Sequence, residues 1–538
     1  MGATVTPFVI KGENDVKHAR LQWNDVSGAS AYDIFRSVDN GEYEFINSVE
    51  GIIVDDYSLE MGHEYCYRIY AMNGSTVVAW AQTKSFEPYE KPSVKVSGNL
   101  SSSGFSTPSS GLRDKDGVYY KISQNKRTDG GSGFGYMTIK TSTDGSNYSS
   151  SKTVLTIEDI LAHETCSEIE DIRFESVNIR YNPKANNFGF IAHAEKGSGG
   201  YSFARIFLAT YTPGDDKMVF HGALRPGGDD VRDLSTYVDD DGTGYIIGAT
   251  HGNADLAIYR LKDDWSGIDK RVALINQGKW RELPSVIKVD GIYYLFTSGC
   301  AGWYPTPGMY NSATSMSGPW SELRRACNTT TFSSQSGYTF SLKTGVDNFI
   351  MNSYRWMSNW KDATVRKNVS IRMPITLSDG YAFYDYFEEL QYNWDENRLI
   401  PAQRGRIVSQ SMPNLRGYNW DIRSNANDGK YLSEWAVDEW PYVWEVDLGQ
   451  SYNLAQMQIS WKIHNGAEAY YNYKIEGSID GSDYVMLCDK TKGYTDYGFT
   501  VNNITGKARY VRLTVEKANP RSEKDYAATL LEVKVIAQ

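Results

Sequence analysis

Basic residues, cysteines and long apolar runs are the scarce features of this sequence, and each shortage excludes a class of protein. Among 538 residues, 55 Lys and Arg face 66 Asp and Glu, and the net charge of -11 at pH 7 repels nucleic acid and anionic membranes. The five cysteines show no CxxC spacing, so the sequence predicts neither a zinc site nor a disulfide framework, although one Cys300–Cys327 bridge stays open. No run of 18 apolar residues occurs, and we expect no membrane-spanning segment and no nucleic-acid partner.

The first residues bear on where the protein acts. The stretch Met-Gly-Ala-Thr-Val lacks the basic and apolar regions of a signal peptide, and we interpret Met1 and Gly2 as residues that replace an export signal. We therefore expect a secreted, periplasmic or cell-surface protein, and we expect a monomer.

Aromatic residues are abundant, with 39 Tyr and 14 Trp in an aromatic content of 13%. Both β-sheets and sugar-binding surfaces use such side chains, because aromatic rings stack on the apolar faces of pyranoses. A chain of this length exceeds what one hydrophobic core supports. We predict an all-β protein of three domains, at residues 1–90, 91–402 and 403–538.

Residues 1–90 contain short runs in which apolar and polar residues alternate, such as ARLQW at 19–23 and YCYRIYA at 65–71. This pattern predicts a β-sandwich. The segment resembles a bacterial fibronectin type III module, in which Trp23 would be the core tryptophan and Leu59 and Tyr65 would lie at the tyrosine corner. Such modules are usually spacers, so we assign Trp23 to the core.

Residues 91–402 repeat one hairpin five times. The hairpins are LRDKDGVYY at 112–120, IRYNPKANNFGF at 179–190, YVDDDGTGY at 237–245, IKVDGIYY at 287–294 and LKTGVDNF at 342–349. Asp-Gly and Asn-rich turns supply the positive φ angles that tight hairpins need. Because the turns recur about every 50 to 70 residues, the spacing predicts a five-bladed β-propeller.

Four polar residues open the inner strands of different blades. Glu282 and Asp233 each lie eight residues before a turn residue, Glu175 opens the inner strand of the second repeat, and Gln335 lies near the start of the fifth. Inner strands of a propeller start at its axis, so these side chains should converge on one pit. Buried carboxylates that close together are costly unless one is protonated, which is how a general acid is made.

Glycoside hydrolysis needs such a protonated carboxyl together with a group that activates water. Six segments occur in the order seen in glycoside hydrolase family 43 and look most like its exo-β-1,3-galactanase branch: VRDLSTYVDDDG at 231–242, RELPS at 281–285, SGCAGW at 298–303, GPW at 318–320, TFSSQS at 331–336 and RW at 355–356. The resemblance implies that Glu282 is the general acid and that Asp233 orients it and tunes its pKa. Glu175 and Gln335 would handle substrate and water. The sugar pocket would be lined by Arg232, Trp303, Tyr304, Arg355 and Trp356.

The first blade departs from that family. Most members place an Asp base there, whereas this chain has STPSSG at 106–111 with Pro108 in the register of the base. Either Glu175 or Gln335 handles the water, or the protein hydrolyses poorly. The predicted function is an inverting exo-glycosidase that removes terminal galactose from plant-type galactan or arabinogalactan. The alternatives are an α-L-arabinofuranosidase or β-D-galactofuranosidase of the same family, and a glycan-binding protein without catalysis.

Residues 403–538 resemble a discoidin domain, the fold of coagulation-factor type C and galactose-binding carbohydrate modules, through WEVDLG at 444–449 and YKIEGSIDG at 473–481. The resemblance implies a structural calcium ion, and the residues that match its ligands are Asn425, Asp428, Ser433 and Glu532. Trp435, Trp440 or Tyr470 would form a sugar platform, with Trp444 in the core.

The histidines share no metal-ligand spacing. His163, His193, His221 and His251 all fall in the predicted propeller, where we interpret them as ordinary polar or core residues, with substrate contact by His193 or His251 as the alternative. The run Asp239-Asp-Asp241 is interpreted as a turn. We expect no cofactor for catalysis and an oligo- or polysaccharide as the partner.

Overall fold

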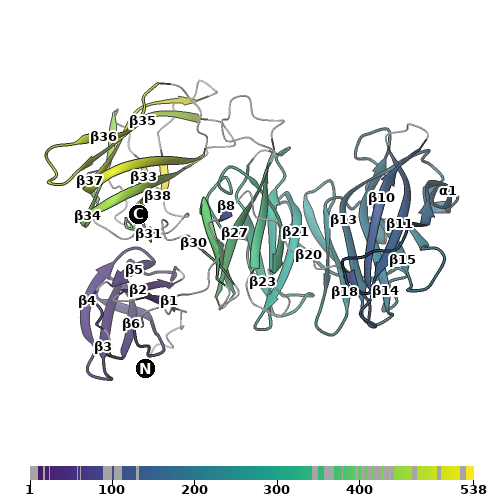
Figure 1. Ribbon diagram of the computed structural model, residues 1–538, viewed down its shortest axis with the longest axis horizontal. Helices are drawn as coiled ribbons and strands as arrows, with labels where there is room; N and C mark the ends of the chain where they lie inside the picture. The colour runs from purple at the N-terminus through teal and green to yellow at the C-terminus, as the bar shows by residue number, and fades with distance from the viewer. Residues whose placement is uncertain are drawn as a thin grey trace.

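The computed structural model describes most of the chain, and the described part consists almost entirely of β-strands (Figure 1). The described residues are 10–15, 18–23, 25–56, 58–60, 62–88, 100–101, 112–128, 133–303, 305–341, 349–356, 369–378, 380–393, 398–401, 406–409, 414–416, 426–428, 431, 435–436, 441–462, 469–492, 498–520 and 529–538. The predicted all-β fold class is confirmed.

The N-terminal part is a β-sandwich of two sheets, with strand orders β1-β2-β5 and β4-β3-β6-β7. The strands are β1 (Ile10–Asp15), β2 (His18–Trp23), β3 (Ala31–Val38), β4 (Glu44–Val49), β5 (Ile53–Asp56), β6 (Tyr65–Asn73) and β7 (Thr76–Gln82). Trp23 is buried in the core, as predicted, and the Tyr65 hydroxyl accepts a hydrogen bond from the Glu60 backbone N–H at 2.8 Å, as in a tyrosine corner. The assignment to the fibronectin type III family stays a prediction.

Five four-stranded antiparallel sheets follow one another along the middle of the chain. Their strands are β9 (Leu112–Arg113), β10 (Tyr119–Lys126), β11 (Phe134–Ser142) and β12 (Lys152–Thr156); β13 (Ile172–Asn182), β14 (Asn187–Lys196), β15 (Arg205–Tyr211) and β16 (Val219–Leu224); β17 (Leu234–Val238), β18 (Gly244–Thr250), β19 (Asp255–Leu261) and β20 (Ile268–Ile275); β21 (Arg281–Val289), β22 (Ile292–Gly299), β23 (Met309–Ala313) and β24 (Arg324–Arg325); and β25 (Gln335–Ser341), β26 (Phe349–Arg355), β27 (Val369–Ser378) and β28 (Tyr381–Tyr384). Short helices in the described residues are α1 (Ile157–Leu161), η1 (Glu164–Cys166) and η2 (Pro226–Gly228).

Each predicted hairpin joins the first two strands of one sheet. The pairs are β9 with β10, β13 with β14, β17 with β18, β21 with β22 and β25 with β26. Gly117, Gly242 and Gly291 have positive φ angles of 81°, 79° and 78°, the conformation that glycine adopts without steric cost. The turn of the fifth hairpin, at 342–348, lies outside the described residues.

The first strands of the second to fifth sheets lie beside one another, because β13 contacts β17, β17 contacts β21, and β21 contacts β25. Apolar clusters fill the space between neighbouring sheets, for example around Phe188, Trp265, Tyr293 and Met351. A small sheet pairs β8 (Leu100–Ser101), before the first blade, with β29 (Glu389–Asn393), after the fifth, and also contains β30 (Arg398–Pro401). Sheets in radial order with their first strands adjacent form a five-bladed propeller.

The C-terminal part is a second β-sandwich. Its strands are β31 (Arg406–Ile407), β32 (Asn414–Arg416), β33 (Trp435–Ala436), β34 (Tyr442–Trp461), β35 (Ala469–Ser478), β36 (Val485–Lys490), β37 (Phe499–Pro520) and β38 (Thr529–Ala537). Trp444 is buried in its core, as predicted. Trp435 is also core, with 2% of its surface exposed, so the prediction of Trp435 as a sugar platform was wrong. Trp440 and the side chain of Tyr470 lie outside the described residues.

The propeller and the C-terminal sandwich share a packed seam. Phe332 and Tyr386 of the propeller stack against each other, and Phe499 of the C-terminal sandwich packs edge-on against both. Lys534 pairs with Asp385 at 2.7 Å across the same seam. Figure 1 shows the C-terminal sandwich above the N-terminal one, on the side of the propeller that carries β27 and β30. The seam therefore makes the end of the propeller and the C-terminal domain neighbours over an apolar contact.

Cys300 and Cys327 are not joined by a disulfide, so the Cys300–Cys327 bridge that the sequence leaves open does not form. Cys327 is buried near the seam, whereas Cys300 is exposed. In the described part of the chain, no helix has the length and apolarity that a membrane crossing requires.

Candidate active site

Glu175 and Glu282, two of the predicted site residues, lie at β-bulges of the same kind. Glu175 pairs with His193 across β13 and β14, and Glu282 pairs with Ser298 across β21 and β22, and in both ladders the register shifts directly afterwards. The residues after the acids have left-handed backbone conformations, with φ of 49° at Ser176 and 48° at Leu283. Bulges re-aim neighbouring side chains, and strained backbone of this kind clusters at functional sites. The repeat of one irregularity in two blades indicates that the fold specifies how each carboxylate is presented.

Glu282 is buried, with 9% of its surface exposed. Burial, followed by the charge of Asp233, raises the pKa of Glu282 to about 7, although the Cys300 thiol, Arg281 and Gln335 act to lower it. A carboxyl group with this pKa holds its proton in a large fraction of molecules at neutral pH. Glu282 can therefore act as a proton donor there.

Gln335 fixes Glu282 from the fifth blade. Its Nε2 donates to Glu282 Oε1 at 2.7 Å and lies 3.3 Å from Ser298 Oγ, while its Oε1 accepts a hydrogen bond from Trp356 Nε1 at 2.7 Å. Gln335 is 3% exposed, so both ends of its amide are committed inside the protein. Trp356 thereby sets which end of the amide faces Glu282.

Asp233 lies immediately before β17 and accepts a hydrogen bond from the Ser176 hydroxyl at 3.1 Å. Burial raises the pKa of Asp233 and the charge of Glu175 adds to this rise, against the opposite effects of His193 and Ser176. The charge of Glu175 thus raises the pKa of Asp233, and the charge of Asp233 raises that of Glu282, which is the electrostatic condition predicted for a general acid.

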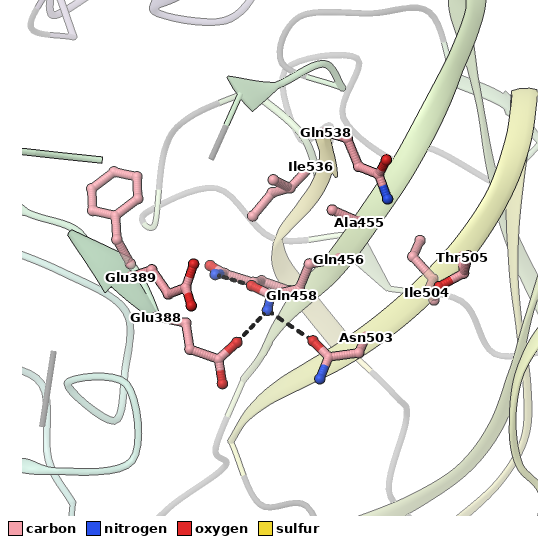
Figure 2. Close-up of a pocket in the computed structure, with 11 residues that line it drawn as sticks. Glu388, Glu389, Ala455, Gln456, Gln458, Asn503, Ile504, Thr505, Ile536 and Gln538 are labelled. Carbon is pink, nitrogen blue, oxygen red and sulfur yellow. Dashed lines mark hydrogen bonds between the residues drawn. The ribbon is translucent and has the colours of Figure 1, made fainter. Parts of the chain in front are cut away.

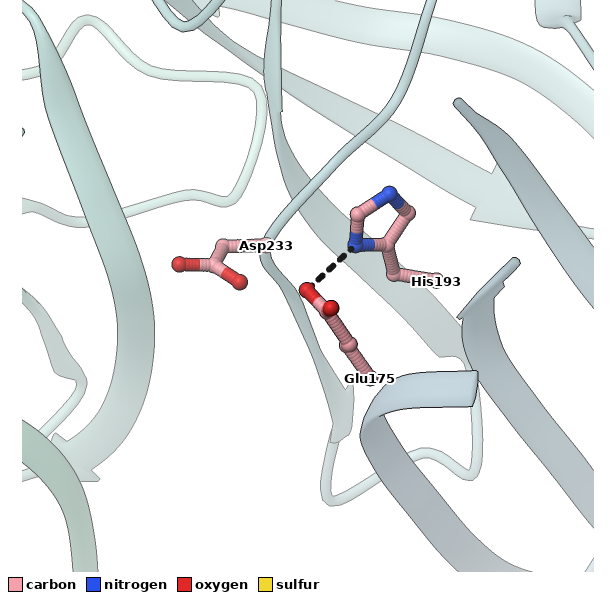
Figure 3. A group of neighbouring side chains, drawn as sticks. All are labelled: Glu175, His193 and Asp233. Atoms are coloured by element: carbon pink, nitrogen blue, oxygen red, sulfur yellow. Dashed lines mark ion pairs between the residues drawn. The ribbon is translucent and has the colours of Figure 1, made fainter. Parts of the chain in front are cut away.

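Glu175, His193 and Asp233 form a cluster in the second and third blades (Figure 3). His193 Nδ1 lies 3.6 Å from Glu175 Oε2, and His193 Nε2 lies 2.9 Å from Glu195 Oε1. His193 and Glu195 are each 1% exposed. Burial alone would raise the pKa of Glu195, but its hydrogen bonds with His193 and with backbone N–H groups outweigh burial and lower that pKa.

His193 was interpreted as an ordinary polar or core histidine, with substrate contact as the alternative, and Glu195 was not singled out. The available signal was their spacing, because residues two apart in a strand point to the same face. The structure places His193, which is buried, against Glu175, one of the predicted site residues. His163, His221 and His251 instead contact Thr165, Thr210 and the pair Asp229 and Asp255, respectively.

The cluster of Glu175, His193 and Asp233 has the donor atoms of a divalent-cation site. One ligand atom from each lies within 4.8 Å of the other two, a grouping that the sequence spacing of the histidines did not predict. Glu195 supports the imidazole from behind, as outer carboxylates commonly do at metal sites.

The residues predicted to line the sugar pocket have different surroundings. Trp303 is 48% exposed, whereas Trp356 is half-buried against Tyr354. Arg232 contacts Asp230 and donates to the backbone carbonyl of Tyr201. The hydroxyl of Tyr201 donates to Glu175 Oε1 at 3.1 Å.

The guanidinium of Arg355 donates to the backbone carbonyl of Phe332 at 3.1 Å and lies over the ring of Tyr386, so it is engaged at the seam. Tyr304 lies outside the described residues. Tyr201 and Ser298, which were not predicted, join the site through their contacts with Glu175 and Gln335.

The predicted calcium ligands are described only in part. Asp428 and Glu532 are both buried, whereas Asn425 and Ser433 lie outside the described residues. The Asp428 backbone carbonyl accepts a hydrogen bond from the Ile52 backbone N–H of the N-terminal sandwich at 3.0 Å. The structural calcium ion stays a prediction.

A propeller whose axis collects a protonated carboxyl group, further carboxylates and an oriented amide defines a carbohydrate-cleaving hydrolase. Residues 97–341 match the family described as "Glycosyl hydrolases family 43", and residues 425–513 match "NedA-like, galactose-binding domain". The chain is a glycoside hydrolase that carries a family 43 domain and a galactose-binding domain.

Two solved structures illustrate what this chain is similar to at low sequence identity. None of the curated proteins matches the chain. A solved exo-β-1,3-galactanase from Phanerochaete chrysosporium, with β-1,3-galactotriose, is similar at 20% identity over 81% of this chain and 100% of that chain, with a TM-score of 0.43. An exo-β-1,3-galactanase from Clostridium thermocellum is similar at 18% identity over 78% of this chain and 100% of that chain, with a TM-score of 0.45. At these values the likeness assigns no substrate to this chain.

Proposed function

We propose that the chain is an inverting exo-glycosidase that removes terminal galactose from plant-type galactan or arabinogalactan, as an exo-β-1,3-galactanase does, with Glu282 as the general acid. The observation that carries the proposal is the buried Glu282 carboxyl, with its raised pKa of about 7 and one oxygen held by Gln335. A carboxyl group that keeps its proton near neutral pH can donate it to the leaving glycosidic oxygen. The galactose-binding domain supports galactose as the sugar.

Asp233 acts through Glu282 as a positioning residue. Its negative charge is the second-largest cause of the raised Glu282 pKa, after burial. Asp233 also accepts a hydrogen bond from the hydroxyl of Ser176, the bulge residue of the strand that presents Glu175. Asp233 therefore sets the protonation of the acid and ties the second blade to the third.

Glu175 is the group that we assign to the attacking water. The side chain of Glu175 is 32% exposed, so water reaches it, and Arg173, Tyr201 and His193 surround its two oxygens. Gln335, the other candidate, has its amide nitrogen on Glu282 and its amide oxygen on Trp356. A neutral, fully engaged amide is a poor proton acceptor, whereas a partly solvated carboxylate can serve as a general base. Glu175 thus takes the role of the first-blade base, which this chain lacks. Pro108, the residue in the register of that base, lies outside the described residues.

The domain organisation suits this function. We assign the hydrolase to residues 91–402, between a spacer at 1–90 and a carbohydrate-binding domain at 403–538, in an exported monomer. The buried Asp428 and Glu532 support a structural calcium ion in the last domain, since hard cations prefer oxygen ligands.

Activity should fall as pH rises above neutrality. The Glu282 carboxyl must be protonated to donate, and its pKa is raised to about 7, so the active fraction is complete well below pH 7 and declines above it. We expect kcat/KM to decrease about tenfold per pH unit on the alkaline side. A profile measured from pH 4 to 9 on a soluble oligosaccharide checks this, and a flat rate between pH 6 and 9 would contradict it.

Sugar release from β-1,3-galactan, arabinogalactan and arabinan tests the substrate. We expect galactose as the product from the first two polymers, identified by chromatography, because the galactose-binding domain supports that sugar. Arabinose released from arabinan would instead establish the furanosidase alternative. No release from any of them would favour a glycan-binding protein.

A further inference from the structure

A cavity of about 330 Å³ lies at the seam between the propeller and the C-terminal sandwich (Figure 2), and its lining includes none of the candidate active-site residues. Glu388 and Glu389 line it from the start of β29, and side chains of β34, β37 and β38 line it from the C-terminal domain. Elsewhere the seam is filled by the rings of Phe332, Tyr386 and Phe499. The cavity is therefore a polar hollow beside an apolar contact of the same interface.

A chain of hydrogen-bonded amides forms one wall of this cavity. Gln458 Nε2 donates to Gln456 Oε1 at 2.8 Å, and Gln456 Nε2 donates to Glu388 Oε2 at 2.7 Å and to Asn503 Oδ1 at 3.1 Å. Gln458 is 3% exposed and Gln456 is 9% exposed, so these amides are held inside the protein in fixed orientations. Figure 2 shows Gln456 between Glu388 of the propeller and Asn503 of the C-terminal domain. The polar wall is thus built before any ligand enters.

The lining selects the chemistry of the ligand. It contains four amides, two carboxylates and one threonine hydroxyl, and it contains no Lys, Arg or His. The negative charge of the lining disfavours phosphate and uronic acids, whereas hydroxyl groups can donate to carboxylates and both donate to and accept from amides. Ile504 and Ile536 add apolar surface for the C–H face of a ring. Pockets of roughly 300 Å³ are at the small end of ligand sites and suit one or two sugar rings.

We propose that this seam cavity is a second carbohydrate site, which binds a neutral mono- or disaccharide unit through Gln456, Asn503 and Glu388 and thereby links the hydrolase domain to the C-terminal domain. The site is separate from the catalytic pit and does not depend on the role of Glu282. A sugar held there contacts both domains at once. Binding should therefore stabilise the seam by mass action, because the ligand favours the docked arrangement.

Calorimetric titration of the full chain with galactose and β-1,3-galactobiose tests the proposal, using Glu282→Gln as the background to prevent hydrolysis. We expect Gln456→Ala and Asn503→Ala to reduce the number of sugars bound by one, or to weaken that site at least tenfold. Gln450→Ala is the matched control, because Gln450 is an exposed amide on the same strand, outside the cavity lining. It should bind as the background protein does. Circular dichroism establishes that each variant is folded, and Asn503 is exposed enough to be truncated without a core cavity.

Three results would overturn the proposal: no binding of either sugar, unchanged stoichiometry and affinity in both cavity variants, or calcium binding that is lost in Glu388→Ala without any sugar binding. The proposed function is read separately, from galactose release by the native chain and by the control variant Gln450→Ala. The rate of that variant on a soluble oligosaccharide should stay within about twofold of the native rate. Loss of galactose release in the native protein, with seam binding intact, would refute the proposed function alone.

Discussion

Glu282→Gln should lower kcat on a galactan oligosaccharide by about 10³-fold while leaving sugar affinity nearly unchanged, since general acid catalysis contributes roughly 10² to 10⁴ in rate. Glutamine keeps the size of the side chain and the contact with Gln335, but it cannot donate a proton of comparable acidity to the leaving oxygen. Initial rates and calorimetric titration with the same oligosaccharide measure the two quantities.

Two substrates with different leaving groups give a sharper test of this variant. An aryl galactoside with an acidic phenol needs little proton donation, so the loss on that substrate should be at least tenfold smaller than on the oligosaccharide. Glu322→Gln is the matched control, because Glu322 is an exposed glutamate in the same sheet region. A loss that is equal on both substrates would show that Glu282 is not the proton donor.

The same substitution should also change the pH dependence of stability. When folding raises the pKa of a carboxyl group, the folded protein becomes less stable as pH rises from the usual pKa of that group toward the raised pKa, here about 7. Glu282→Gln removes that penalty, so its Tm relative to the native protein should increase between pH 4.5 and pH 8. A constant difference in Tm over this range would mean that the native Glu282 pKa is not raised.

Glu175→Gln should reduce kcat on every substrate by about 10² to 10³, because its base role concerns the water and not the leaving group. The amide can still accept from Tyr201 but can no longer take a proton from water. The loss should therefore be of similar size for the oligosaccharide and the aryl galactoside. This distinguishes the base from the acid, for which the two substrates differ.

Rescue by azide tests whether Glu175 is the residue that activates the water. A small anion needs no base, so sodium azide should restore turnover of the aryl galactoside by Glu175→Gln and yield a glycosyl azide of inverted configuration. Gln335→Ala, which removes the other candidate, should gain nothing from azide. Rescue of Gln335→Ala with none in Glu175→Gln would move the water-activating role to the fifth blade.

The sequence predicted the propeller and four of its axial residues because both depend on local patterns. Turn glycines such as Gly242 and Gly291 determine where a hairpin reverses, and counting back from a turn gives the residue at the start of the strand. Glu282 and Asp233 were located in this way. Their raised pKa values could be anticipated in direction, because inner strands of adjacent blades bring carboxylates together.

Other parts of the site depend on contacts between segments that are distant in sequence. His193 and Glu195 lie on a second strand, and nothing local shows that this strand faces Glu175. The bulges at Ser176 and Leu283 arise from pairing across two strands, and neither residue is of a type that favours positive φ. Trp435 was misassigned because burial of a tryptophan in a loop-rich segment depends on which strands cover it.

The seam cavity had no signal in the sequence for the same reason. Gln456 and Gln458 alternate along β34 like any strand residues that face one side, and Glu388 lies 68 residues before Gln456. Only the docking of the two domains brings the carboxylate to the amide. Polar residues on a strand of a carbohydrate-binding domain are therefore informative only when their partners across a domain boundary are known.

The anomeric form of the first sugar released tests the central claim most directly. Proton NMR of an early reaction with β-1,3-galactobiose should show α-galactose first, with the β anomer growing in by mutarotation, because a water held at Glu175 attacks while Glu282 protonates the leaving oxygen. β-Galactose as the first product would mean a covalent intermediate and would contradict the proposed roles of Glu175 and Glu282.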